Sequence, residues 1–435
     1  MSFLFWTLVQ FLAPLSVLLF WILGFLLPVM VWMERKVEAL IQDRHGPSRT
    51  HLGGLRWLGM VHNLAVLFRS PGKEDRSFDE QSPLWTRAAP FLLVLSAWLP
   101  MALLPFGESV QVGSHTFHAQ MAPLNTSTWI VLFLLSLQPF AFLLAGADSR
   151  APLVRRGVNR SVLQSSLALL LLWLAVGSAT MAYGSADLAA LVQTQGHNAF
   201  TWGLLLSPLG AFLAWIALMM LQERSPFDLT GGRTELLTGA FLGYSGLSFD
   251  MARSSRSLLL LTGSGLWVTL FLGGWQVPFL SNGFLQQHSV TLLTGLLLFF
   301  GILLLMGSVL LISNILKPLH RWGDRRDRES HRMLPLLVGT ASVLFALALV
   351  VLPQFSTLTP LWLAHGTRIL FQLLAFSSKL LLVALVTMWV QASLPRFRLD
   401  QVLRLGWHWW LPMGLANFFI TGLWSKFWLH FWGVL

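Results

Sequence analysis

The sequence predicts an all-α polytopic membrane protein, and three observations lead to this fold class. The 435 residues are 55% hydrophobic and only 11% charged, whereas a soluble domain has about 25% charged residues. Apolar runs of about 20 residues, the length a helix needs to cross the hydrocarbon core, recur along the chain. The runs are continuous and do not alternate with polar residues, which favours helices over a β-barrel.

The apolar runs define about ten expected transmembrane helices. The first run begins with "MSFLFWTLVQ". Because it has no basic leader and no small-residue cleavage motif, we interpret it as a span and not as a signal peptide. Trp and Phe residues near the ends of the runs are typical of interfacial anchors. The expected spans are residues 4–33, 85–105, 127–147, 162–182, 200–221, 257–275, 289–314, 334–353, 368–393 and 409–433.

Basic residues gather in the loops on one side of these spans. Cytoplasmic loops carry the excess of Lys and Arg, so we expect these loops to be cytoplasmic and both termini to be periplasmic. The net charge of +11 follows from the same loops and does not indicate binding to nucleic acid. The basic loops are residues 34–84, 148–161, 222–256, 315–333 and 394–408.

The segment 51–68 is too short and too polar to cross the membrane. Its apolar residues recur at helical spacing, which predicts a helix lying on the cytoplasmic membrane surface or under a partner. No internal repeat is present, and we expect residues 1–435 to form a single membrane domain. The apolar face of the surface helix consists of Leu55, Leu58, Val61, Leu64 and Phe68.

The chain has no cysteine, so it has no thiolates for an iron–sulfur cluster and forms no disulfide. His115 and His118 share one outside loop, but two histidines without further ligands do not predict a metal site. The sequence has no phosphate-binding glycine loop and no nucleophile constellation. We therefore expect no catalytic residue on this chain and any electron carriers on partner chains.

Four cytoplasmic segments and one span end carry motifs in a fixed order. They are "ERKVEALIQDRHGPSR" (34–49), "LAGADSRAPLVRRGVNRSVLQSS" (144–166), "SPFDLTGGRTELLTGAFLGYSG" (225–246), "FLGGW" (271–275) and "ASLPRFRLDQVLRLGW" (392–407). Together they resemble the family of the H-type membrane subunit (subunit 1) of respiratory complex I, the NADH–quinone oxidoreductase. The resemblance is collinear over nearly the whole chain.

The resemblance implies a family core of eight spans. Residues 1–288 and 354–435 correspond to this core, and residues 289–353 add a pair of helices joined by a charged loop. Because two added spans preserve the orientation of the spans that follow, we expect an inserted helix pair facing lipid or an additional partner.

The resemblance also implies a function. In this family the membrane protein forms the floor of a quinone chamber on which a hydrophilic arm carrying the redox centres docks. Quinone is then the substrate, FMN and iron–sulfur clusters belong to partner subunits, and the neighbours are other membrane subunits, hydrophilic iron–sulfur and quinone-site subunits, and lipid. The residues implied at the chamber or arm interface are Gln42, Arg44, Gly46, Pro47, Arg49, Arg224, Pro226, Phe227 and Asp228.

Several of these residues also have a simpler interpretation. Arg44 and Arg49 fit ordinary positive-inside topology, and Gly46-Pro47 alone predicts only a turn. Lys379 lies within an apolar run, where an ionisable group is a functional candidate. It is a candidate for charge transfer or for contact with a neighbouring subunit, unless it extends toward the membrane surface.

The proton path implied by the resemblance has lost several of its carboxylates in this sequence. Positions where the family has glutamate are occupied by Gly231, Arg233, Gly243 and Leu169, and none of the 18 acidic residues interrupts an apolar run. Asp228 and Glu235 remain, and Glu235 alternatively is a solvated charge at a helix end. With Lys379 they make up the predicted proton or charge path.

The leading hypothesis is a divergent H-type subunit of a complex I-like translocase in a prokaryotic inner membrane, catalytic only as part of that complex. Two alternatives remain. One is a subunit of a membrane-bound hydrogenase-type relative, and the other is a structural membrane scaffold without quinone chemistry or proton pumping.

Overall fold

The computed structural model of the chain describes residues 15–44, 46, 47, 72, 84–112, 115–147, 152–196, 199–229, 241, 244–278, 280–315, 324–355 and 361–431. The predicted surface helix at 51–68 lies outside these residues.

The chain divides into two compact units. The first consists of residues 1–46, 63–279 and 373–435, and the second consists of residues 47–62 and 280–372. The second unit contains the whole segment 289–353, which the sequence predicts as an inserted helix pair. Two statements stay predictions: the chain forms a single membrane domain, and this segment is an insertion in it.

The first unit is built almost entirely from helices, because its sequence consists of long apolar runs whose backbone groups bond within the segment. Its elements are η1 (Val17–Leu26), α2 (Leu27–Ile41), α4 (Leu84–Leu103), β1 (Val110–Val112), β2 (His115–Phe117), α5 (Ser127–Gly146), α6 (Pro152–Tyr183), α7 (Leu188–Gln195), η4 (Ala199–Thr201), α8 (Gly203–Leu206), α9 (Pro208–Leu221), α10 (Gly246–Phe271), α15 (Leu399–Leu405), η9 (Gly406–Trp410) and α16 (Leu411–Phe431). Helix α14 (Leu361–Ser393) contributes its residues from 373 onward.

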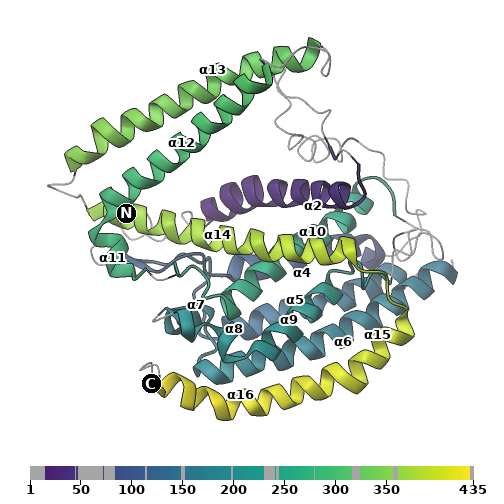
Figure 1. The fold of residues 1–435 in the computed structure, drawn as a ribbon. Helices are drawn as coiled ribbons and strands as arrows, with labels where there is room; N and C mark the ends of the chain where they lie inside the picture. The colour runs from purple at the N-terminus through teal and green to yellow at the C-terminus, as the bar shows by residue number, and fades with distance from the viewer. Residues whose placement is uncertain are drawn as a thin grey trace. The chain divides into compact units, whose positions relative to one another are not determined.

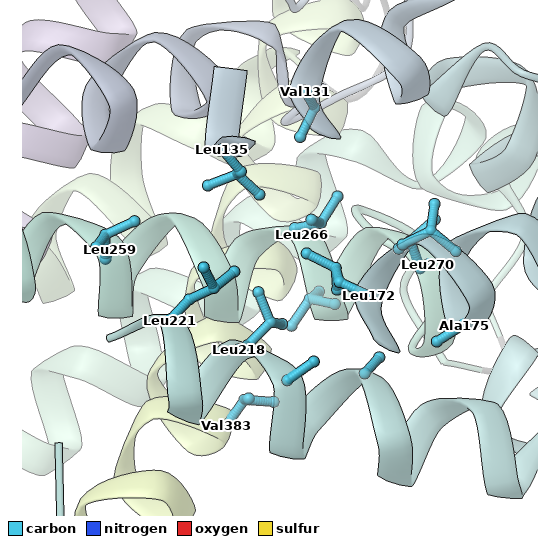
Figure 2. Packing of buried hydrophobic residues seen from close by; sticks show 14 of the residues in the cluster. Val131, Leu135, Leu172, Ala175, Leu218, Leu221, Leu259, Leu266, Leu270 and Val383 are labelled. Atoms are coloured by element: carbon cyan, nitrogen blue, oxygen red, sulfur yellow. The ribbon is translucent and has the colours of Figure 1, made fainter. Parts of the chain in front are cut away.

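The core of the first unit lies between helices that pack side by side (Figure 1). Helix α4 packs against α5 and α10, and α6 packs against α5, α9 and α16. Figure 2 shows apolar side chains from several helices meeting in this core, among them Leu135 of α5, Leu172 of α6, Leu218 of α9, Leu266 of α10 and Val383 of α14.

Buried polar side chains tie these helices together in pairs. Ser96 of α4 donates a hydrogen bond to Gln138 of α5, and Thr262 of α10 donates to the Ala97 carbonyl of α4 at 2.6 Å. The Asn417 side chain of α16 donates to Ser178 of α6 at 3.0 Å. Within a low-dielectric core such groups must find partners, so they fix which helix faces which.

Several helices extend beyond the apolar runs from which they were predicted. Helix α2 continues to Ile41, so residues 34–41, which we predicted as a loop, are helical. Helices α6 and α10 begin at Pro152 and Gly246 instead of near residues 162 and 257. Hydropathy detects only the part of a helix that lies in hydrocarbon, whereas backbone hydrogen bonding continues into charged turns.

The connection between α4 and α5 contains a short β-hairpin, which the all-helical prediction did not include. β1 and β2 pair antiparallel, with Val110 opposite Phe117 and Val112 opposite His115. This pairing satisfies the backbone groups of a connection that has no helix of its own.

The second unit contains a pair of long helices. Gly301 of α12 lies against the Phe345 ring of α13, where an added Cβ would come within 2.9 Å of the ring. The unit's elements are α11 (Asn282–Gln287), α12 (Ser289–Ile315), α13 (Asp324–Ala346), η7 (Leu347–Val351) and η8 (Leu352–Phe355), together with the first residues of α14.

Within the described residues, five helices are long and apolar enough to cross a membrane. The prediction of a helical membrane protein is therefore confirmed, while the count of about ten spans stays a prediction. The five segments are Leu84–Leu103, Ser127–Gly146, Pro152–Tyr183, Ser289–Val309 and Leu363–Ser393.

The close approach of α8 to the end of α10 predicts the effect of Gly203→Ala. A Cβ at Gly203 would come within 2.3 Å of the Leu270 carbonyl oxygen and 3.1 Å of the Phe271 Cα. Because these are backbone atoms, we expect overpacking to lower the free energy of unfolding by about 1–3 kcal/mol. The measurement is thermal unfolding of the purified protein. Gly295→Ala, which meets open space, is the matched control, and equal melting temperatures for the two variants would contradict the prediction.

Candidate functional site

Arg224 follows the end of α9 and is the centre of a buried polar cluster. Its side chain is 5% exposed and forms an ion pair with Glu34 of α2. Its Nη1 also donates to the Gln391 Oε1 of α14 at 3.3 Å, and its Nη2 donates to the Ser257 Oγ of α10 at 3.4 Å. One guanidinium thus joins three helices that are distant in the sequence.

A second ion pair lies beside the first in the sequence. Glu223 is 1% exposed, and its Oε2 lies 3.2 Å from the Nη2 of Arg256 in α10. The Arg256 guanidinium also lies over the Phe241 ring, 5.7 Å from its centroid. Glu223 adopts a left-handed conformation with φ of 49°, which ends α9 and turns the chain toward Arg224.

The cluster has an excess of positive charge. Arg35 is half-buried in α2, next to Glu34. Burial lowers the pKa of Arg35, and the charge of Arg253 lowers it further, while Glu34 and Glu38 oppose both effects. The carboxylates are therefore needed to hold the arginines together in a partly desolvated place.

Pro226 and Phe227 connect this turn to the segment that follows α14. The Pro226 carbonyl accepts a hydrogen bond from the Phe397 backbone N–H at 2.9 Å. Phe227 is buried between the rings of Phe397 and Trp410, with centroid distances of 5.7 and 5.9 Å. Asp228 follows in the same turn and is half-buried.

Gln42 and Arg44 follow the end of α2 and are exposed. Arg44 forms an ion pair with Glu38 at 3.3 Å, and its Nε donates to the Gln42 side chain at 2.7 Å. Gly46 is packed closely, since a Cβ there would come within 2.9 Å of the Lys36 side chain.

The other predicted site residues are not brought to Arg224 by the described structure. Pro47 is half-buried and belongs to the second unit. Arg49 and Glu235 lie outside the described residues. Lys379 binds the backbone at the C-terminal end of α10, where its Nζ donates to the Leu272 carbonyl at 2.7 Å, whereas Arg224 binds Ser257 in the first half of α10.

Tyr244 of the Tyr-Ser-Gly motif connects the same region to α4 and α5. Its hydroxyl group donates to the Thr86 carbonyl at 2.9 Å and reaches the Ala145 carbonyl at 3.4 Å. Burial of the phenol raises the pKa of Tyr244 above its ordinary value. The motif therefore holds the segment before α10 against two neighbouring helices.

An apolar cavity of about 350 Å³ lies elsewhere in the first unit, with Trp98, Leu103, Met121 and Leu134 in its walls. None of the predicted quinone-chamber residues that the structure describes lines this cavity. The polar cluster around Arg224, and not this cavity, is the candidate functional site.

Our prediction from the sequence missed five residues of the site: Glu34, Glu223, Arg256, Ser257 and Gln391. Glu34 was part of a quoted motif but was placed in a loop. Gln391 is an amide near the end of an apolar helix and directly before the motif at 392–407. Its position in the sequence could therefore have indicated a site residue. Neither Glu223 nor Arg256 has a sequence pattern that indicates its partner.

The arrangement can bind and orient a polar group. A guanidinium of fixed charge offers directed N–H donors to an oxygen atom. The neighbouring carboxylates Glu34 and Glu223 hold the arginines in place. The cluster is therefore suited to orienting a polar group.

Comparison with known proteins places the chain in a family. The model of the family described as NADH dehydrogenase matches residues 13–320 and 332–422. The match includes most of the segment 289–353 and leaves out residues 321–331.

Curated relatives are similar over almost their whole length, and each is an H subunit of NADH-quinone oxidoreductase. The H subunit of Bdellovibrio bacteriovorus is 27% identical over 418 residues, covering 91% of this chain and 90% of the relative. The first H subunit of Solibacter usitatus is 28% identical over 430 residues, covering 97% of each chain. The H subunit of Salinibacter ruber is 25% identical over 397 residues, with coverage of 91% and 90%.

The Glu34–Arg224 ion pair predicts a non-additive pair of substitutions. Arg224→Met alone leaves Glu34 without its partner, and Glu34→Gln alone leaves a buried guanidinium without its carboxylate. We expect each variant to unfold at a lower temperature than the wild type, and the double variant to recover part of the loss, with a coupling of about 0.5–3 kcal/mol. A thermal-unfolding double-mutant cycle measures this coupling. Additive losses would show that the two side chains do not interact.

Proposed function

The chain belongs to the NADH dehydrogenase family, and from this membership we propose that it is the H-type membrane subunit of a complex I-like NADH–quinone oxidoreductase. In this function it docks the hydrophilic arm that carries the redox centres and lines the chamber in which quinone is reduced. It is catalytic only as part of the complex, because FMN and the iron–sulfur clusters belong to partner subunits. The proposed location is a prokaryotic inner membrane, with the Arg224 end facing the cytoplasm.

The observation that supports this proposal most directly is the meeting of three motifs at one guanidinium. Glu34 comes from the first motif, Arg224 precedes Pro-Phe-Asp-Leu, and Gln391 precedes the last motif. Residues in or next to motifs that are separate in the sequence thus form one polar place between α2, α10 and α14. Such a place suits a quinone headgroup, whose carbonyl oxygens accept hydrogen bonds.

The proposed proton path is depleted. The five helices long and apolar enough to span contain no Asp or Glu, and Leu169, where a family glutamate is expected, is buried in α6. The proposed path therefore retains two carboxylates, Asp228 and Glu235, and one cation, Lys379. A chain with so few titratable groups takes up protons near its edge and leaves most translocation to neighbouring subunits.

One observation favours a purely structural role as a second candidate. Glu34, Gln391 and Ser257 already accept hydrogen bonds from Arg224, so this residue cross-links the chain by itself. A membrane scaffold needs only this cross-link and no quinone. Activity and assembly measured on the same variant distinguish the two functions.

Arg224→Gln tests the quinone function. We expect the quinone reductase activity of the assembled complex to fall at least about 10-fold. A hydrogen-bond donor near a reacting oxygen accelerates a reaction by a factor on the order of 10²–10³. The measurement is quinone reduction by purified complex, with a quinone-site inhibitor as reference. Arg404→Gln, at an exposed position of α15, is the control. Wild-type activity of an assembled Arg224→Gln complex would favour the scaffold.

Glu235→Gln tests the remaining proton path. If the carboxylate accepts protons from the chamber, its amide cannot, and we expect a lower ratio of protons translocated to electrons transferred in sealed vesicles. Asp400→Asn, whose native side chain is 81% exposed, should leave the ratio unchanged. An unchanged ratio for Glu235→Gln would assign proton transfer to other subunits.

A further inference from the structure

The ammonium group of Lys379 lies in a cage of backbone carbonyl oxygens. Its Nζ donates to the carbonyls of Leu272 at 2.7 Å, Gly274 at 3.1 Å and Gln276 at 2.6 Å. It also lies 4.4 Å from the centroid of the Trp202 ring. Carbonyl oxygens and an aromatic face all attract cations, so the cage is a built receptor for an ammonium ion.

The cage closes the C-terminal end of α10. The last carbonyls of a helix have no partner in the helix, and an unsatisfied carbonyl in the membrane is costly. The Gln195 side chain of α7 donates to the carbonyls of Thr269 and Leu270, each at 3.2 Å. Lys379 completes this closure at Leu272 and at the turn beyond it.

Charge complementarity supports a permanent cation at this place. The C-terminal end of a helix carries partial negative charge, which favours a cation. Helix α10 has no basic residue in its own last turn, so the cation comes from another helix, α14. The helix end and its counter-charge are therefore on different segments of the chain.

The number of donors indicates which form of the amine fits. An ammonium group has three N–H donors and no acceptor, and three carbonyls receive them. A neutral amine would direct its lone pair at one of these oxygens. The cage therefore binds the charged form and leaves Lys379 with no further donor for passing a proton onward.

The turn that supplies the carbonyls is rigid and closely packed. Gly273 and Gly274 have positive φ values of 68° and 47°, which side chains rarely adopt. A Cβ would come within 2.7 Å of Trp202 at Gly273 and within 2.6 Å of Val192 at Gly274. The conformation is therefore fixed with its carbonyls directed at Lys379.

We propose that Lys379 is a fixed structural cation whose ammonium group, held by the Leu272, Gly274 and Gln276 carbonyls and the Trp202 ring, closes α10 and anchors α14 to it. Within the proposed charge path it contributes a constant charge and does not carry protons. Because α14 is continuous to Ser393, the anchor also sets the position of Gln391, about 18 Å along the helix axis at 1.5 Å per residue.

The test removes the cation and then supplies it from solution. Lys379→Ala deletes three methylene groups and the ammonium, which together correspond to n-propylammonium. We expect the intact complex with Lys379→Ala to melt several degrees below the wild type, and n-propylammonium to raise its melting temperature more than that of the wild type. Lys379→Met fills the same space without charge, so it should be destabilised and gain nothing from the amine. Lys426→Met, at an exposed position of α16, is the control for removing a lysine from a helix.

Proton translocation separates the fixed cation from a carrier. We expect assembled Lys379→Arg complex, whose guanidinium keeps the charge and does not release its proton, to keep the wild-type ratio of protons to electrons. A lower ratio with an unchanged melting temperature would overturn the proposal, as would an equal effect of the amine on the Ala and Met variants. If the Lys379→Ala complex does not assemble, we measure instead how much complex forms in membranes prepared with n-propylammonium. No increase in the amount of complex with the amine would also overturn the proposal.

Discussion

The buried guanidinium of Arg224 is the interaction that sets the arrangement of the candidate site. A cation that is 5% exposed is stable only with a carboxylate and further acceptors around it. Glu34, Gln391 and Ser257 supply them from α2, α14 and α10. Three helix positions are thereby set by one charge, and the Pro226-Phe227 turn follows because it is joined directly to Arg224. The meeting of the motifs is a consequence of satisfying this charge.

Two places along α10 show the same constraint in different forms. In the first half of the helix, Ser257 and Arg256 contact the charged turn after α9. At its C-terminal end, carbonyl oxygens are the groups that need partners, and Gln195 and Lys379 donate to them. In a medium without water, each polar group must be matched by the chain. Helix α14 contacts both places, through Gln391 and Lys379, and so connects the candidate site to the far end of α10.

The distribution of carboxylates is the observation from which we propose a depleted proton path. The half-buried Glu34 and the buried Glu223 are both paired with arginines, so they stabilise cations. The charged groups of the described structure therefore serve first to hold helices together. This is consistent with the proposed function in which quinone binding and docking are retained and proton transfer is reduced.

The helical membrane class, the order of the motifs and the family follow from the sequence alone, because apolar runs and contiguous motifs are local properties. The sequence also indicated Arg224, Pro226, Phe227 and Asp228, which form one turn. It did not predict that helices continue into charged segments such as residues 34–41, since hydropathy does not report backbone hydrogen bonding there. The pairing of Glu34 with Arg224, 190 positions away, and the contact of Lys379 with the carbonyls at the end of α10 arise only in the folded chain. Partners so far apart are selected by helix packing, which brings together groups that no spacing along the chain relates.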